Sequence, residues 1–70
     1  MTPTLSELTS REEAVLDLAG ELSEEQIARR FGMTANTVRK HLASCRAKLD
    51  APSTVAAVRK LERMRRARTA

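Results

Sequence analysis

The sequence predicts an all-α domain of four helices with a helix-turn-helix at its centre. Apolar residues recur at spacings of three and four, which is typical of helices that pack one face against a core. The signals that indicate strands are missing, because there is no sustained apolar/polar alternation and no Asn-Gly or Asp-Gly turn. Residues 22–42 contain two helix starts separated by one tight turn, and this arrangement predicts the helix-turn-helix.

The first helix is expected over residues 9–20. Thr9 and Glu12 have the spacing of a capping box, in which each side chain accepts a hydrogen bond from the backbone N–H of the other residue. Gly20 offers a stop at the C-terminal end. One apolar stripe of this helix is expected to face the core, and it consists of Ala14, Val15, Leu18 and Ala19. Leu16 lies beside this stripe.

The second helix is expected over residues 23–32. Ser23 and Gln26 have the spacing of a second capping box. Gly32 is expected to adopt the left-handed conformation that ends the helix, with Met33 folding back over the last turn as in a Schellman ending. The residues expected to face inward are Ile27, Ala28 and Phe31.

The third helix is expected over residues 34–49, with Thr34 as its N-cap. Met33 also precedes this helix and can pack against Val38, so one side chain is expected to fix the angle between the second and third helices. Pro52 disfavours helical geometry at the residue before it, which is expected to end the helix. The expected core stripe consists of Val38, Leu42, Cys45 and Leu49.

The fourth helix is expected from Ser53 towards Arg66. The residues of this helix that can close the core are Ala57, Val58 and Leu61. Val55 and Ala56 lie partly off that stripe. The expected organisation is therefore an N-terminal tail over residues 1–7, the helix-turn-helix domain over residues 8–62, and a basic C-terminal tail with a frayed end over residues 63–70.

Length and composition restrict the class of protein. Seventy residues form at most one domain with a thin core. The single cysteine excludes an internal disulfide, and the sequence has no Cys/His cluster with zinc spacing. There is no signal peptide and no apolar stretch long enough to span a bilayer. We therefore expect a cytoplasmic domain without metal or cofactor.

The net charge of +4 is unevenly distributed along the chain. Residues 1–38 contain three Lys/Arg and seven Asp/Glu, a net charge of −4, whereas residues 39–70 contain ten and two, a net charge of +8. A domain divided in this way can present one face to a polyanion. Phe31 is the one residue of the chain among Phe, Tyr and Trp. Proteins that bind single-stranded DNA or RNA usually stack the bases on aromatic rings, so the scarcity of such residues favours duplex DNA as the ligand.

Several short strings, taken together with their spacings, resemble the LuxR/GerE-type helix-turn-helix family over residues 8–61. The strings are Leu8-Thr9-Ser10-Arg11-Glu12, Val15-Leu16, Leu22-Ser23, Ile27-Ala28, Thr37-Val38-Arg39-Lys40-His41, Lys48-Leu49 and Ala57-Val58. The resemblance implies a four-helix DNA-binding domain in which the third helix reads the major groove and the fourth supplies a dimer contact. Such domains usually end a larger regulator, and this chain looks like a stand-alone version or a fragment.

The sequence departs from the family pattern at four places. The segment between Leu16 and Ser23 is one residue shorter than usual, and its glycine comes earlier. Glu24-Glu25 replaces the usual Asn-Lys, and Asp50 replaces the usual glycine after the third helix. Ala43 stands where many relatives have a polar or basic reader, which implies a narrower base readout.

The outer face of the third helix carries the candidate DNA contacts. Arg39 can bind guanine bidentately, whereas Asn36 can bind either adenine or a phosphate. Thr37 lies near a helix N-terminus, where a phosphate contact is favoured. The resemblance adds a phosphate contact for His41, which can equally be a half-buried structural residue. The complete expected DNA-binding set is Thr34, Asn36, Thr37, Arg39, Lys40, His41, Ala43 and Arg46, and the expected dimer contact is Val55, Ala56 and Arg59.

No constellation in the sequence indicates catalysis. Glu24 and Glu25 are neighbours on a helix and diverge by about 100°, so they cannot share an acid/base site. There is no set of nucleophile, base and orienting group, and no glycine-rich phosphate loop. Cys45 lies on the core stripe and is interpreted as a buried apolar residue, because a redox sensor needs an exposed thiol of low pKa. We expect a protein that is not an enzyme.

The predicted function is a sequence-specific transcription regulator that binds duplex DNA. It is expected to bind two half-sites as a dimer, and this dimer can form only on DNA. One alternative is a protein-interaction module. Another is a domain like region 4 of a sigma factor, docked on RNA polymerase, which shares the run Ser…Ile-Ala…Thr-Val-Arg. His41 and the full fourth helix with Ala57-Val58 argue against the sigma-factor alternative.

Overall fold

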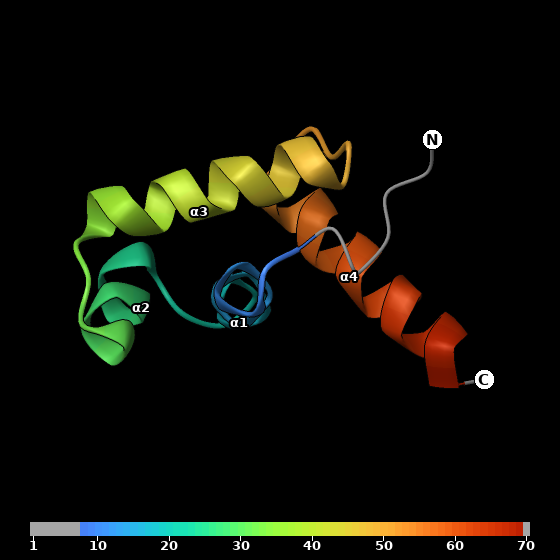
Figure 1. Cartoon of the computed structure of the whole chain (residues 1–70), viewed down its shortest axis with the longest axis horizontal. Coiled ribbons are helices and arrows are strands. Elements are labelled where there is room, and N and C mark those ends of the chain that lie inside the picture. The colour runs from blue at the N-terminus through green and yellow to red at the C-terminus, as the bar shows by residue number, and fades with distance from the viewer. Residues whose placement is uncertain (1–7, 70) are drawn as a thin grey trace.

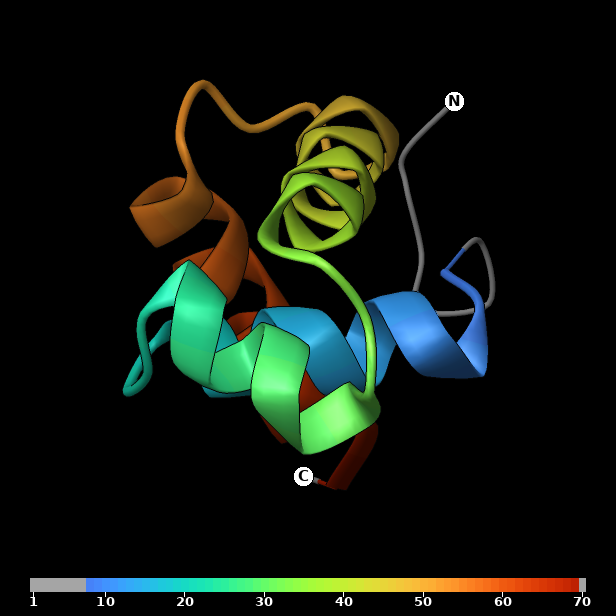
Figure 2. The same ribbon diagram turned by 90° about the vertical axis from the view of Figure 1, so that its left-hand side faces the viewer.

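Four helices make up most of residues 8–69, the part of the chain that the computed structural model describes. They are α1 (Ser10–Ala19), α2 (Glu24–Phe31), α3 (Ala35–Lys48) and α4 (Thr54–Thr69). In Figure 1, α1 is seen end-on below α3, α2 lies below the N-terminal end of α3, and α4 descends from its C-terminal end. Figure 2 shows α3 nearly end-on above α1 and α2, which run across the view. The predicted all-α, four-helix fold with a helix-turn-helix is confirmed.

The core lies where α3 packs against α1 and α2, and where α4 packs against α1 and α3. The predicted stripe of α3 is confirmed, because all four of its residues are buried. Ala57 and Leu61 close the core from α4 as predicted, while Val58 is partly buried against it. The complete buried apolar cluster is Leu8, Val15, Leu16, Ile27, Ala28, Val38, Leu42, Cys45, Leu49, Ala57 and Leu61.

The predicted stripe of α1 is confirmed only in part, because Val15 is buried and Leu18 and Ala19 pack against the core, but the stripe is not centred on the buried face. Leu16, which was expected beside the stripe, is fully buried together with Val15, whereas Leu18 is only partly buried. The buried face of α1 is centred on Glu12, Val15 and Leu16, at positions i, i+3 and i+4. A buried carboxylate on this face is the reason for the error, because an apolar pattern cannot include a charged residue.

The starts of the helices follow the predicted capping pattern. Thr9 and Glu12 form a complete capping box, with the Glu12 N–H donating to Thr9 Oγ1 at 3.1 Å. Ser23 and Gln26 form the second one, with the Gln26 N–H donating to Ser23 Oγ at 3.2 Å. Ser53 caps α4 without a reciprocal contact, because its hydroxyl accepts from the backbone N–H of Ala56 at 3.1 Å and alanine has no side-chain acceptor. These starts are therefore determined locally.

The turn between α2 and α3 depends on a left-handed glycine, as predicted. Gly32 has φ 65° and ψ 38°. The Met33 N–H donates to the carbonyl of Ala28 at 2.9 Å and the Gly32 N–H donates to that of Arg29 at 3.4 Å, which is the Schellman ending. Gly20 ends α1 differently, because it is right-handed, and a Cβ there would lie 3.3 Å from Val58 Cγ1 of α4.

The end of α3 is determined by Asp50 more than by the proline that follows. Asp50 has φ 52°, and the Ala51 N–H donates to the carbonyl of Arg46 at 2.8 Å, so this is a second Schellman ending. Lys60 of α4 donates its ammonium to the carbonyls of Leu49 and Asp50 at 3.0 and 2.8 Å. A cation therefore satisfies the two carbonyls that directly follow α3 and joins this end of the helix to α4.

Replacing Asp50 with glycine is expected to raise the free energy of unfolding by a few tenths to about 1 kcal/mol. A non-glycine residue pays a steric penalty in the left-handed region, which exceeds the extra entropy of glycine in the unfolded chain. Urea unfolding measures the effect. Asp50→Ala is the control, because it removes the same charge from the end of α3 but retains a Cβ. Equal stabilisation by both substitutions would attribute the gain to charge instead of conformation.

The frayed C-terminal end was predicted incorrectly, because α4 continues as a helix to Thr69. Arg65 explains part of this order. Its two terminal nitrogens donate to Asp17 and Glu13 of α1 at 2.7 and 2.9 Å, and Met64 packs against the core. No helix within residues 8–69 is long and apolar enough to cross a membrane.

Candidate nucleic-acid interface

The face of α3 turned away from the core is exposed. Its exposed residues Asn36, Lys40, Ala43 and Ala47 follow one another at spacings of four, three and four, and Arg39 lies beside them. α3 contains no aspartate or glutamate. In the described part of the chain no other helix lies over its upper side in Figure 1. An α-helix about 10–12 Å across fits a major groove about 12 Å wide, so this face can enter DNA.

The N-terminal end of α3 is held by a threonine pair. Thr34 Oγ1 accepts from the backbone N–H of Thr37 at 3.1 Å, and the two hydroxyl oxygens lie 3.0 Å apart. Thr34 is exposed and Thr37 is half-buried. Both residues therefore act first as the cap of α3, as predicted, and both remain at the edge of the exposed face.

Arg39 is part of an ion pair that was not predicted from the sequence. Its Nε lies 3.0 Å from Oε1 of Glu24, in the first turn of α2. The side chains of Arg39 and Glu24 remain 61% and 41% exposed. The two residues are 15 positions apart, and they meet only because the turn at Gly32 brings the start of α2 beside α3.

The other predicted contacts divide into two groups. Asn36 and Lys40 are exposed, their side chains have no hydrogen bond or ion pair within residues 8–69, and Ala43 is exposed beside them. His41 and Arg46 are half-buried, and Arg46 donates from Nη1 to the hydroxyl of Thr54 at 3.0 Å. Arg46 is therefore directed to the start of α4, away from the middle of the exposed face.

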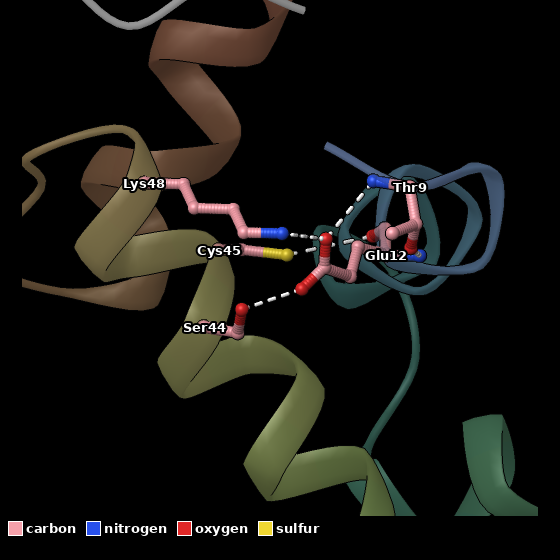
Figure 3. Close-up of polar contacts among 5 residues, drawn as sticks. All are labelled: Thr9, Glu12, Ser44, Cys45 and Lys48. Atoms are coloured by element: carbon pink, nitrogen blue, oxygen red, sulfur yellow. Dashed lines mark hydrogen bonds and ion pairs between the residues drawn. The ribbon is translucent and has the colours of Figure 1, made fainter. Parts of the chain in front are cut away.

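A buried carboxylate fixes the position of α3 on α1 (Figure 3). Glu12 projects from α1 towards α3, where Oε1 accepts from Lys48 Nζ at 2.6 Å and Oε2 accepts from the hydroxyl of Ser44. The same Oε1 accepts from the backbone N–H of Thr9 at 2.9 Å. The Glu12 side chain is only 7% exposed. Together with the core stripe of α3, these contacts hold α3 on α1 with its exposed face turned outward.

The pKa of Glu12 reflects this environment. Burial by itself would raise the pKa, but the hydrogen bonds from Lys48, Ser44 and Thr9 and the charge of Lys48 outweigh it and lower the pKa from 4.5 to about 2. The carboxylate is therefore ionised throughout the neutral range. The capping box predicted the contact with Thr9, but no pattern in the sequence predicted that α3 would supply the other two partners.

The prediction that Cys45 belongs to the core is confirmed. Its side chain is fully buried, and the thiol donates to the backbone carbonyl of Glu12 at 3.5 Å. Burial, with a further contribution from the negative charge of Glu12, raises the pKa of Cys45 to about 11. A buried thiol that resists ionisation is unsuited to redox sensing.

Several cations of the basic half of the chain bind other parts of the domain. Lys48 pairs with Glu12, Lys60 caps the end of α3, and Arg65 binds two carboxylates of α1. The charge distribution predicted a basic region correctly, but it could not distinguish paired cations from exposed ones. Lys40 is an exposed cation of α3 without a partner within residues 8–69.

The predicted dimer residues lie on the first half of α4. Val55 is 62% exposed and is the one large hydrophobic residue in the described part of the chain that is this exposed. Ala56 is partly buried and Arg59 is exposed. An isolated valine at the surface is normal, but its place beside an uncharged alanine leaves an apolar spot at the start of α4.

The sequence of the chain matches a known protein family, although it matches no individual relative. Within residues 8–69 no group of three or more His, Cys, Asp or Glu residues could hold a metal ion. Neither a curated protein nor a solved structure matches the chain significantly. The family model GerE, described as bacterial regulatory proteins of the luxR family, matches residues 6–61. The chain therefore belongs to the luxR family of bacterial regulatory proteins, a non-enzymatic family of helix-turn-helix domains that bind DNA.

Proposed function

We propose that the domain regulates transcription by binding a defined duplex DNA sequence, with α3 in the major groove. The observation that carries the proposal is the exposed face of α3, which presents Asn36, Arg39 and Lys40 on a helix without carboxylates. Phe31 supports duplex DNA over a single strand. Its ring is half-buried and lies under the guanidinium of Arg11, 5.0 Å from the ring centroid, so it is not a free surface for base stacking.

Each residue of the interface has a proposed role. Arg39 binds the O6 and N7 atoms of a guanine, Asn36 binds adenine or a phosphate, and Ala43 contacts the methyl group of a thymine. The residues proposed to contact the phosphate backbone are Thr34, Thr37, Lys40, His41 and Arg46. Phosphate contacts position the helix, and base contacts supply the sequence preference.

The second part of the proposal is a symmetric dimer on two half-sites, joined through Val55, Ala56 and Arg59 of α4. The domain measures 33 × 22 × 19 Å, so two copies placed side by side can present their α3 helices about one helical turn of DNA apart, near 34 Å. The apolar contact is small. The dimer is therefore expected to assemble on DNA, where two adjacent half-sites hold the copies together.

Arg39→Ala is expected to weaken binding to the preferred duplex by about 1–3 kcal/mol and to relax the preference at one base pair. Lys40→Ala removes the same charge and is the matched control. It is expected to weaken binding to all duplexes similarly and to reduce the dependence of affinity on salt. Titration of duplexes selected from a random pool by the wild-type chain, at several salt concentrations, measures both effects.

Both side chains are exposed, so thermal melting should confirm that the two variants fold like the wild type. Unchanged affinity and preference in both variants would exclude α3 as the reader. If binding of the chain to DNA does not depend on salt and no duplex is preferred, the alternative function is favoured, in which the domain docks onto another protein.

A further inference from the structure

The ion pair between α2 and α3 suggests a role for a residue outside the reading helix. Resting on the proposed function, we infer that Glu24 is a specificity-determining positioning residue, which holds Arg39 by its Nε and directs its two terminal nitrogens towards the base. The contact that carries this inference is the 3.0 Å hydrogen bond from Arg39 Nε to Glu24 Oε1.

The geometry leaves the reading end of Arg39 available. Arginine has five N–H donors in a planar fork, and the contact with Glu24 uses only the one on Nε. Within residues 8–69 neither terminal nitrogen of Arg39 has a hydrogen-bond partner. Those two nitrogens match the O6 and N7 acceptors of guanine in an end-on bidentate contact. Glu24 therefore occupies the donor that this contact does not need.

The position of Glu24 is itself well fixed. It is the first residue of α2, directly after the N-cap Ser23, whose capping box with Gln26 defines the start of the helix. The Glu24 carboxylate lies in the first turn, where the helix dipole favours an anion. A half-buried acceptor on a rigid element can restrict the rotamers of the long side chain that it binds.

The pair is expected to matter for binding more than for folding. Both side chains remain partly solvated, and ion pairs in contact with solvent contribute little to the stability of a fold. DNA would exclude water from the pair and strengthen its electrostatic coupling. An arginine that is already oriented also loses less rotamer entropy when it binds a base. Both effects favour the correct base over others.

Glu24 has a second effect, because its negative charge repels nearby phosphates on every sequence. The adjacent Glu25 carries the same charge in the same turn and is exposed, and its side chain has no hydrogen bond or ion pair within residues 8–69. Comparing the two residues therefore separates orientation of Arg39 from general repulsion.

The experiment compares Glu24→Ala with Glu25→Ala on the preferred duplex and on duplexes altered at each base pair. Glu25→Ala should raise affinity for all duplexes about twofold, with preference unchanged. Glu24→Ala should raise affinity for non-preferred duplexes by the same factor as Glu25→Ala. It should also lower discrimination at the base pair read by Arg39 by about three- to tenfold. Glu24→Gln, which keeps an acceptor oxygen for Nε, should retain part of the discrimination.

The Arg39→Ala background completes the test, because Glu24→Ala should there no longer change discrimination. If Glu24→Ala behaves like Glu25→Ala while Arg39→Ala loses the preference, the role of Glu24 is excluded and the proposed function stands. If Glu24→Ala instead tightens binding to the preferred duplex most, Glu24 blocks Arg39 and the inference is overturned. If Arg39→Ala leaves the preference intact, the proposed function itself fails.

Discussion

Replacing Glu12 with alanine is expected to lower the free energy of unfolding by about 2–4 kcal/mol, less than the cost of breaking a fully buried ion pair, because the Lys48 side chain is 34% exposed. The substitution leaves Lys48 without its counter-ion, Ser44 without its acceptor and the Thr9 N–H without its cap. A domain of this size has a total stability of only about 4–10 kcal/mol. Glu12→Ala should therefore leave a domain that is close to unfolding at room temperature.

Urea and thermal unfolding, followed by the loss of helical circular dichroism, measure this effect. Glu13→Ala is the matched control, because it removes the neighbouring carboxylate, whose ion pair with Arg65 is more solvated. That control should cost less than about 1 kcal/mol. Equal losses for both variants would contradict the central role of Glu12. Glu12→Gln keeps one acceptor and should lie between wild type and Glu12→Ala.

The same carboxylate predicts how stability depends on pH. The folded state lowers the pKa of Glu12 from 4.5 to about 2, so its contribution is fully present above 4.5 and is lost as the pH falls towards 2. Wild type should therefore lose more stability than Glu12→Gln between pH 5 and pH 2, although other carboxylates titrate in both proteins. Melting curves of both proteins at several pH values across this range measure the effect. If stability falls equally steeply with pH in both proteins, a lowered pKa for Glu12 is excluded.

The parts of the fold that depend on local chemistry were predictable from the sequence. Both capping boxes, the left-handed Gly32 and the core stripe of α3 follow from local patterns, in which the successive residues are three or four positions apart. The burial of Glu12 was not predictable in this way. Its capping role accounts for one contact, whereas Ser44 and Lys48 lie 32 and 36 residues further along the chain. Only the packing of α3 on α1 brings them together.

The candidate site likewise has features that the sequence predicts and contacts that depend on the packing of the helices. The exposed residues of α3 follow directly from its core stripe, since they occupy the opposite side of the helix. The partners of the long cations do not follow, because Arg39, Arg46 and Lys60 reach residues whose positions depend on the angles between helices. A count of charges therefore identifies a basic half of the chain but not the cations that can meet DNA.

Replacing Val55 with glutamate is expected to lower affinity for a duplex with two half-sites by about a hundredfold, because it removes the linkage between the two bound copies. Affinity for a single half-site should fall only about twofold, through the added negative charge. Val55 is 62% exposed, so the fold should be unaffected and the melting temperature unchanged. The proposed dimer would bury this side chain against its own copy across a twofold axis.

Titrations of one-half-site and two-half-site duplexes, with the number of bound chains measured at saturation, test this expectation. Ala67→Glu is the charge-matched control, because it adds the same charge at an exposed position about three turns further along α4. It should reduce both affinities slightly and equally. Two chains should saturate the two-half-site duplex in the wild type, with cooperativity that Val55→Glu abolishes and Ala67→Glu retains. Saturation by one chain, or equal losses on both duplexes for Val55→Glu, would show that α4 does not join two copies and that α3 binds DNA as a monomer.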